Sequence, residues 1–277
     1  MDDRRRKNHH GYQLRSIAQF KQSAPADCYH FWYSTSMKSL ITRACLHPID
    51  YSGALTKRKI IFKEKVQESP GIYSFIFDLE KPCTWQAGQH AIFTLPGKQV
   101  QGKTWRPFSV ASSPCEGVIR IGTNVPAEPS DFKKKLMELR PGEEAAMYGP
   151  FGEFHRGSGL SQIVGIAGGI GITPFRSLIA DIVANQDEHT NLTLIYSAKD
   201  SYTYQAELDK WAEDPRINII YTHTPDEVNA ALTEQINTYR NRAHYFIAGP
   251  PGMIEALRKT LQQKGIKKIV NDPFKGY

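Results

Sequence analysis

Short stretches in which apolar and polar residues alternate dominate residues 59–150. Every second residue of a β-strand lies on the same face, so each stretch predicts a strand with one buried face. The predicted buried faces carry Tyr73, Phe75, Phe77 and Leu79, then Ala91, Phe93 and Leu95, then Ile119 and Ile121. Turns that contain Pro and Gly separate these strands at short intervals, which is typical of an antiparallel β-barrel.

A short helix is predicted within the barrel sequence. Ser130 suits the N-cap position, and Phe132, Leu136 and Leu139 follow at helical spacing. The last barrel strand is then expected at residues 145–148.

From residue 161 onward, apolar strands alternate with amphipathic helices. The predicted strands are residues 161–167, 192–196, 217–221 and 245–248. The predicted helices begin at Pro174 and then cover residues 204–211, 228–239 and 253–263. This alternation is typical of a doubly wound parallel sheet. The predicted fold class is therefore an antiparallel β-barrel domain followed by an α/β domain.

These patterns also predict the domain boundaries. We expect a barrel domain over residues 56–154 and an α/β domain over residues 155–277. Residues 1–55 show no clear periodicity, so we expect them to form a disordered N-terminal appendage. A weak organelle-targeting segment and an over-long gene start are the alternatives.

The net charge of +7 is confined to the N-terminal part of the chain. Residues 1–59 hold eleven Lys and Arg against four Asp, which accounts for the whole charge. The rest of the chain is neutral, which argues against a groove that binds nucleic acid. No apolar stretch reaches the roughly 20 residues of a membrane span, and no hydrophobic secretory core is present near the N-terminus. We therefore expect no membrane span and a cytoplasmic location.

The cysteines argue against an iron–sulfur cluster. They are widely separated, with neither a C-x-x-C pair nor a C-x4-C-x2-C sequence. We expect packed thiols rather than metal ligands at Cys28, Cys45, Cys83 and Cys115.

A glycine-rich turn joins a predicted strand to a predicted helix at residues 168–174. Glycines allow the backbone to approach a pyrophosphate, while Thr173 suits a helix cap and Pro174 suits the first turn. The positive end of the helix would then face the anion. A tight turn without a ligand is the alternative. The predicted phosphate contacts are Gly168, Gly169, Gly171, Thr173 and Pro174.

Three motifs occur in an order that resembles one known family. Residues 106–109 are Arg-Pro-Phe-Ser, residues 168–174 are Gly-Gly-Ile-Gly-Ile-Thr-Pro, and residues 248–253 are Ala-Gly-Pro-Pro-Gly-Met. Over residues 59–277 the chain is similar to the ferredoxin-NADP reductase family. This resemblance implies a bound FAD and a nicotinamide coenzyme, NADPH or NADH.

The resemblance implies that residues 106–109 bind the flavin. Arg106 would hold the FAD phosphates, Phe108 would stack on the isoalloxazine ring, and Ser109 would lie near flavin N5 as a catalytic residue. Pro107 belongs to the same motif. Relatives often have Tyr at the position of Phe108, so this chain keeps the stacking surface without the phenol hydroxyl.

The resemblance also implies a phosphate contact at the start of the predicted barrel helix. The backbone amides of Ser130, Asp131 and Phe132 would face the FAD pyrophosphate. A surface Arg and an ordinary core Phe are the alternative interpretations of Arg106 and Phe108.

The third motif and the C-terminal aromatics would contact the nicotinamide. Gly249, Pro250 and Met253 would lie beside it, while relatives often have Cys in place of Ala248. The resemblance further implies an aromatic that covers the flavin face where the nicotinamide binds. The candidates are Phe274, as a catalytic gate or else a core residue, and Tyr277.

Coenzyme choice is expected to depend on the loop after the strand at residues 192–196. Lys199, Ser197 and Tyr204 offer a cation and hydroxyl groups for a 2′-phosphate, whereas Asp200 suits an unmodified ribose. We expect NADPH, with NADH as the alternative. Lys199 and Asp200 also fit a solvated pair without a ligand.

The function implied by the resemblance is NAD(P)H oxidoreduction. Electrons would pass from the reduced nicotinamide through FAD to an external acceptor such as ferredoxin or flavodoxin. One alternative is a reductase component of an oxygenase, or a flavin or ferric reductase. A non-catalytic subunit that binds FAD and nucleotide is an alternative of another class.

Overall fold

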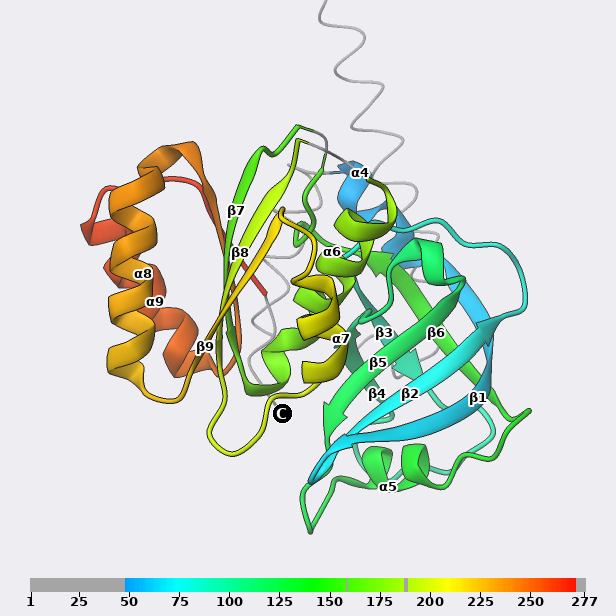
Figure 1. Cartoon of the computed structure of the whole chain (residues 1–277). Coiled ribbons are helices and arrows are strands. Elements are labelled where there is room, and N and C mark those ends of the chain that lie inside the picture. The colour runs from blue at the N-terminus through cyan, green and yellow to red at the C-terminus, as the bar shows by residue number, and fades with distance from the viewer. Residues whose placement is uncertain (1–47, 158, 187–188, 273–277) are drawn as a thin grey trace, which may run out of the picture.

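The computed structural model describes residues 48–157, 159–186 and 189–272, and Figure 1 shows two sheets side by side. The first sheet is antiparallel, with strand order β4-β3-β6-β1-β2-β5. An isolated bridge between Val110 and Ile121 joins the chain after β4 to β5, which closes the barrel. Its elements are β1 (Lys57–Ser69), β2 (Ile72–Leu79), β3 (His90–Thr94), β4 (Trp105–Ser109), η2 (Pro114–Glu116), β5 (Val118–Asn124), α5 (Asp131–Met137) and β6 (Glu144–Phe151).

The apolar positions that predicted the barrel strands form its core. Phe75, Phe77, Phe93, Ile119 and Ile121 are all buried in one cluster. Side chains of α5 belong to the same cluster, so this helix covers the barrel at one end (Figure 1). The antiparallel barrel is therefore confirmed.

The second sheet is parallel, with strand order β11-β10-β7-β8-β9. Helices α6 and α7 lie between this sheet and the barrel, and α8 and α9 cover its other face (Figure 1). Its elements are β7 (Gln162–Gly168), η3 (Gly169–Gly171), α6 (Ile172–Ala184), β8 (Asn191–Ser197), α7 (Gln205–Trp211), β9 (Ile217–Thr222), α8 (Pro225–Tyr239), η4 (Arg240–Arg242), β10 (His244–Ala248), α9 (Pro251–Gln263) and β11 (Ile269–Asn271).

The doubly wound sheet is confirmed, and the strand order changes direction between β7 and β10. Ligands of such sheets bind at this point, outside the carboxyl ends of the strands. The sequence pattern did not predict β11, because a strand of three residues is too short to show a period. We keep 56–154 and 155–277 as the proposed domain boundaries.

Residues 48–55, which were assigned to the N-terminal appendage, pack on the outside of the barrel. They form α4 (Pro48–Tyr51) and η1 (Ser52–Leu55). Tyr51 and Ala54 are buried in a cluster with Trp105 and Tyr148. The packed part of the chain thus begins before residue 56, while residues 1–47 lie outside the described part. Across the described residues, no helix is long and apolar enough to cross a bilayer.

A buried arginine joins the barrel to the α/β half. Arg176 on α6 is 2% exposed and binds the Glu207 carboxylate on α7 with two hydrogen bonds of 2.8 Å. The same guanidinium makes two bonds of 3.0 Å to Glu116 of the barrel and one of 2.8 Å to the Ala111 carbonyl. Arg120 of the barrel also binds Glu207, at 3.0 Å. These contacts set the position of the two halves relative to each other.

Candidate functional site

A cleft of about 900 Å³ lies between the barrel and the parallel sheet. Its volume is at the upper end of the range for small-molecule sites, roughly 300–1,000 Å³. The predicted site residues that it brings together are Arg106, Pro107, Phe108, Ser109, Gly168, Gly169, Gly171, Thr173, Ser197, Lys199, Gly249, Pro250 and Met253. All three sequence motifs therefore contribute to one cleft.

The floor of the cleft is formed by the turns that follow β7 and β10. A Cβ atom on Gly171 would overlap the carbonyl group of Ala248, and one on Gly168 would overlap the side chain of Met253. Only glycine fits at position 171, because the backbone of the neighbouring turn occupies the space of a side chain, whereas at position 168 the Met253 side chain would have to move. The turns after β7 and β10 thus pack closely together at the point where the strand order changes direction.

The start of α6 differs from the prediction by two residues. The helix begins at Ile172 with Gly171 as its N-cap, because residues 169–171 already form a 3-10 turn. Thr173 lies in the first turn and donates a hydrogen bond of 3.1 Å to the Ile170 carbonyl, so it is not the cap. Pro174 is also in the first turn, as predicted, but it is buried and does not line the cleft.

Strand β4 presents its motif to the cleft from the edge of the sheet. Arg106 is 9% exposed, and its Nη1 donates to the carbonyls of Lys103 at 2.7 Å and Trp105 at 2.8 Å. Phe108 lines the cleft and also contacts Phe93 edge-on, with ring centroids 5.7 Å apart. Phe108 is therefore a core residue that also lines the cleft, and its stacking on the flavin stays a prediction.

Helix α5 contributes a different residue from the three that were predicted. Ser130 is the N-cap but makes no capping bond with its side chain. The Asp131 carboxylate accepts a hydrogen bond of 2.6 Å from the backbone N–H of Gln101. Phe132 is fully buried beneath Phe108. None of the three lines the cleft, whereas Lys133 does. Lys133 was not predicted from the sequence, because a run of three lysines is typical of an exposed helix face.

Two lysines lie near Arg106, of which Lys133 is buried and Lys103 is half-buried. Lys133 is 8% exposed, and its Nζ donates a hydrogen bond of 2.6 Å to the Asn124 carbonyl. Burial, and next the charge of Arg106, lower the pKa of Lys133. The same two causes lower the pKa of Lys103 to about 8. Positive charge is thus concentrated at the barrel end of the cleft.

Ser109 contacts a residue that was not singled out in the sequence. Its hydroxyl donates a hydrogen bond of 3.1 Å to the carboxylate of Asp272, which also lines the cleft. The amide of Asp272 donates to the Ile247 carbonyl at 2.9 Å. Because Asp272 directly follows β11, a strand that the pattern did not predict, the sequence offered no reason to place it at the site.

Only part of the predicted coenzyme loop lines the cleft. Ser197, Lys199 and Asp200 line the cleft, and so does His223, which the sequence analysis did not select. Tyr204 does not, so its predicted phosphate contact is wrong. Its side chain is 4% exposed, its hydroxyl lies 3.0 Å from the Ser74 hydroxyl of the barrel, and burial raises its pKa to about 12.

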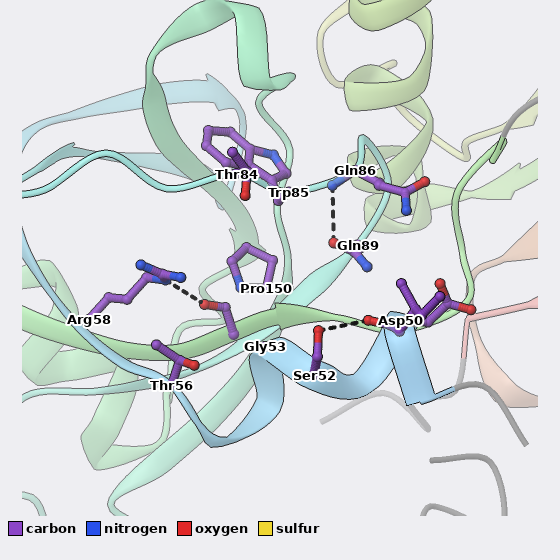
Figure 2. A pocket seen from close by; sticks show the side chains of 12 residues that line it. Asp50, Ser52, Gly53, Thr56, Arg58, Thr84, Trp85, Gln86, Gln89 and Pro150 are labelled. Carbon is purple, nitrogen blue, oxygen red and sulfur yellow. Dashed lines mark hydrogen bonds between the residues drawn. The ribbon is translucent and has the colours of Figure 1, made fainter. Parts of the chain in front are cut away.

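A second, smaller pocket of about 310 Å³ lies between α4, η1 and the barrel (Figure 2). Arg58 lines it and donates from Nε to the Gly149 carbonyl at 3.2 Å. Gln86 and Gln89 lie opposite Arg58. The backbone N–H of Gln86 donates a hydrogen bond of 3.0 Å to Oε1 of Gln89. None of the predicted site residues lines this pocket, so the motifs point to the larger cleft.

Two predicted aromatics and two of the four cysteines lie outside the described residues, and the prediction for Cys115 is wrong. Phe274, Tyr277, Cys28 and Cys45 lie outside the described part of the chain. Cys83 is half-buried, but Cys115 is exposed and is not a packed thiol. Within residues 48–157, 159–186 and 189–272, no group of three or more His, Cys, Asp or Glu could hold a metal ion.

Comparisons with known proteins agree with this arrangement. Residues 166–259 match the model of the oxidoreductase NAD-binding domain. The chain is 27% identical to NADH-cytochrome b5 reductase 1 of Laccaria bicolor over 220 residues, which cover 73% of this chain and 70% of that protein. It is also 27% identical to the reductase component of phenol 2-monooxygenase from a Pseudomonas strain over 237 residues, 78% of this chain and 63% of that protein.

The fold is shared with solved reductases. A variant of ferredoxin-NADP+ reductase from Plasmodium falciparum superposes with a TM-score of 0.66 at 18% identity, and the match covers 78% of this chain and 95% of that one. The chain spans only about half the length of several other curated relatives. In motif order, fold and relatives, the chain is similar to the ferredoxin-NADP reductase-type flavoprotein oxidoreductases.

Proposed function

We propose that the chain is an FAD-dependent NAD(P)H oxidoreductase that delivers electrons to an external acceptor. The observation that carries this proposal is the common cleft. The motif at residues 106–109 and the glycine-rich turn at residues 168–171 come from different sheets and line the same space. A flavin on the barrel side and a nicotinamide on the α/β side would meet there.

The residues of the cleft fit two dinucleotides. Gly168, Gly169 and Gly171 line the cleft next to the positive end of α6, where their backbone would face a pyrophosphate. At the other end, the buried cation of Arg106 fits the phosphates of FAD. Bound FAD would supply the chemistry, since it accepts two electrons as a hydride and can release them singly.

The residues of the chain would hold the two ring systems in reacting geometry. Phe108 and Pro107 would support the flavin, and Ser109 would present its hydroxyl to the N5 side. Gly249, Pro250 and Met253 would lie against the nicotinamide. Positioning of this kind lowers the barrier because the reactants no longer have to find each other in solution.

The adenosine end of the coenzyme is assigned to the loop after β8. Lys199 and Ser197 line the cleft there and would bind a 2′-phosphate. We keep NADPH as the proposed coenzyme, with NADH as the alternative offered by Asp200. Phe274 is retained as the proposed gate over the flavin face.

The acceptor is proposed to be a separate electron carrier such as ferredoxin or flavodoxin. The second candidate is the oxygenase of a two-component system, which is supported by the similarity to a phenol 2-monooxygenase reductase component. A cytochrome is a further candidate, because another relative is named as a cytochrome b5 reductase.

Anaerobic mixing tests the proposal. The purified protein, reconstituted with FAD, should bind one flavin and lose its yellow absorbance when NADPH or NADH is added. A protein that takes up neither FAD nor FMN would overturn the proposal. A flavin that binds but is never reduced would instead support a non-catalytic subunit. The reduced protein should then be tested against ferredoxin, flavodoxin, cytochrome b5, quinone, ferric chelate and free flavin.

A further inference from the structure

We propose that Lys133 is a phosphate-binding residue of the flavin site and acts together with Arg106 on the pyrophosphate of FAD. The proposal rests on the FAD binding proposed above and deepens it. Lys133 lies outside the three motifs that identified the site in the sequence.

The geometry places both cations on the same part of the cleft. Lys133 comes from α5 and Arg106 from β4, and both line the cleft although each is more than nine-tenths buried. The Asn124 carbonyl takes one of the three N–H groups of the ammonium. Two N–H groups thus remain for a ligand, in a position that the Asn124 bond holds in place.

The electrostatics indicate the charge of that ligand. A buried ammonium loses much of its hydration, and a second cation nearby adds repulsion. Both effects act on Lys133, whose pKa is lowered by burial and by Arg106. An anion between the two side chains removes the repulsion and replaces the lost hydration with charge-assisted hydrogen bonds. A pyrophosphate, with two adjacent negative phosphates, matches a pair of cations on facing elements.

The chain offers a matched control on the same helix. Lys134 follows Lys133 directly but is exposed and does not line the cleft. Replacing either residue by Met removes one positive charge from α5 and keeps a long apolar side chain. Only the Lys133 variant should alter phosphate binding.

The experiment compares flavins with and without a phosphate. Apoprotein is titrated with FAD, and separately with riboflavin, while flavin fluorescence is followed. Lys133→Met should weaken FAD binding roughly tenfold to hundredfold, as expected for loss of a bond to a charged group. Riboflavin binding should stay the same, Lys134→Met should match the wild type with both flavins, and Lys133→Arg should retain most of the FAD affinity.

The outcomes separate this proposal from the one on which it rests. A wild-type protein that binds no flavin would defeat the proposed function itself. A wild type that binds FAD together with an unchanged Lys133→Met variant would overturn the role of Lys133 alone. Equal losses for FAD and riboflavin would indicate packing instead of phosphate binding. If Lys133→Met does not fold, Lys133→Gln, which can still donate to Asn124, should show the same selective loss.

Discussion

The hydroxyl of Ser109 donates a hydrogen bond of 3.1 Å to the carboxylate of Asp272, although the two residues are 163 positions apart. Ser109 ends β4 of the barrel, and Asp272 follows β11 of the parallel sheet. The bond therefore crosses the cleft between the two halves. The orientation of the Ser109 hydroxyl depends on both of them.

Ser109→Ala should leave FAD bound and slow its reduction. We expect loss of the hydroxyl to raise the activation free energy of flavin reduction by about 1–1.5 kcal/mol, the usual contribution of one hydrogen bond. The reduction rate in stopped-flow measurements should then be roughly fivefold to tenfold lower. Ser161→Ala, which changes an exposed Ser outside the cleft, is the control and should reduce at the wild-type rate. An unchanged rate for Ser109→Ala would show that this hydroxyl has no catalytic role.

Lys199→Ala should raise the Michaelis constant for NADPH and spare NADH. The side chain is exposed, so the lost charge interaction is worth about 1 kcal/mol and the expected change is roughly fivefold. Lys210→Ala removes an exposed Lys from α7, outside the cleft, and should change neither constant. Equal losses for both coenzymes would show that this loop does not recognise the phosphate.

Arg176→Met should lower the free energy of unfolding by about 3–5 kcal/mol, because it leaves two carboxylates without their buried cation. Although burial acts to lower it, the bonds to Glu207 and Glu116 raise the pKa of Arg176, which shows how strongly the charged form is held. Urea denaturation measures the change. Lys135→Met, which removes a surface pair with Glu138, should leave the free energy of unfolding nearly unchanged. A similar cost for both variants would contradict the structural role of Arg176.

FAD affinity should fall as the pH rises above about 8, the value to which burial and Arg106 lower the pKa of Lys103. A phosphate near Arg106 favours the charged ammonium and so raises this pKa in the complex. The contribution of Lys103 is then complete below its pKa in the free protein, and it is lost as the pH rises through its pKa in the complex.

The pH dependence is measured as the dissociation constant of FAD from about pH 6.5 to about pH 9.5. Lys103→Arg keeps its charge over this range and should show a flatter profile. An equally steep fall in that variant would mean that another group titrates.

The proposed gate at Phe274 predicts that deletion of residues 274–277 tightens nicotinamide binding, because an aromatic stacked on the flavin would have to leave before the nicotinamide could bind. Coenzyme titration and the charge-transfer absorbance of the complex report the change. If both stay at their wild-type values, the gate is not Phe274.

The barrel and the parallel sheet were predictable from the sequence because their patterns are local. The alternation through Phe75 and Phe77 and the helical stripe through Phe175 and Leu178 depend only on neighbours along the chain. The glycine-rich turn was predictable for the same reason, since a strand, a tight turn and a helix follow one another without a gap. Even there, the 3-10 turn moved the helix start by two residues.

Only the tertiary structure decided which other residues reach the cleft. Lys133 lines the cleft, whereas the three predicted residues before it, Ser130, Asp131 and Phe132, do not. Tyr204 was predicted to bind phosphate, but its hydroxyl contacts Ser74 of the barrel. Asp272 accepts a hydrogen bond from Ser109 because the C-terminal ends of β11 and β4 both lie at the cleft. These contacts depend on how the two sheets pack against each other. That packing is set by buried contacts such as those of Arg176, between residues far apart in sequence, which no local period encodes.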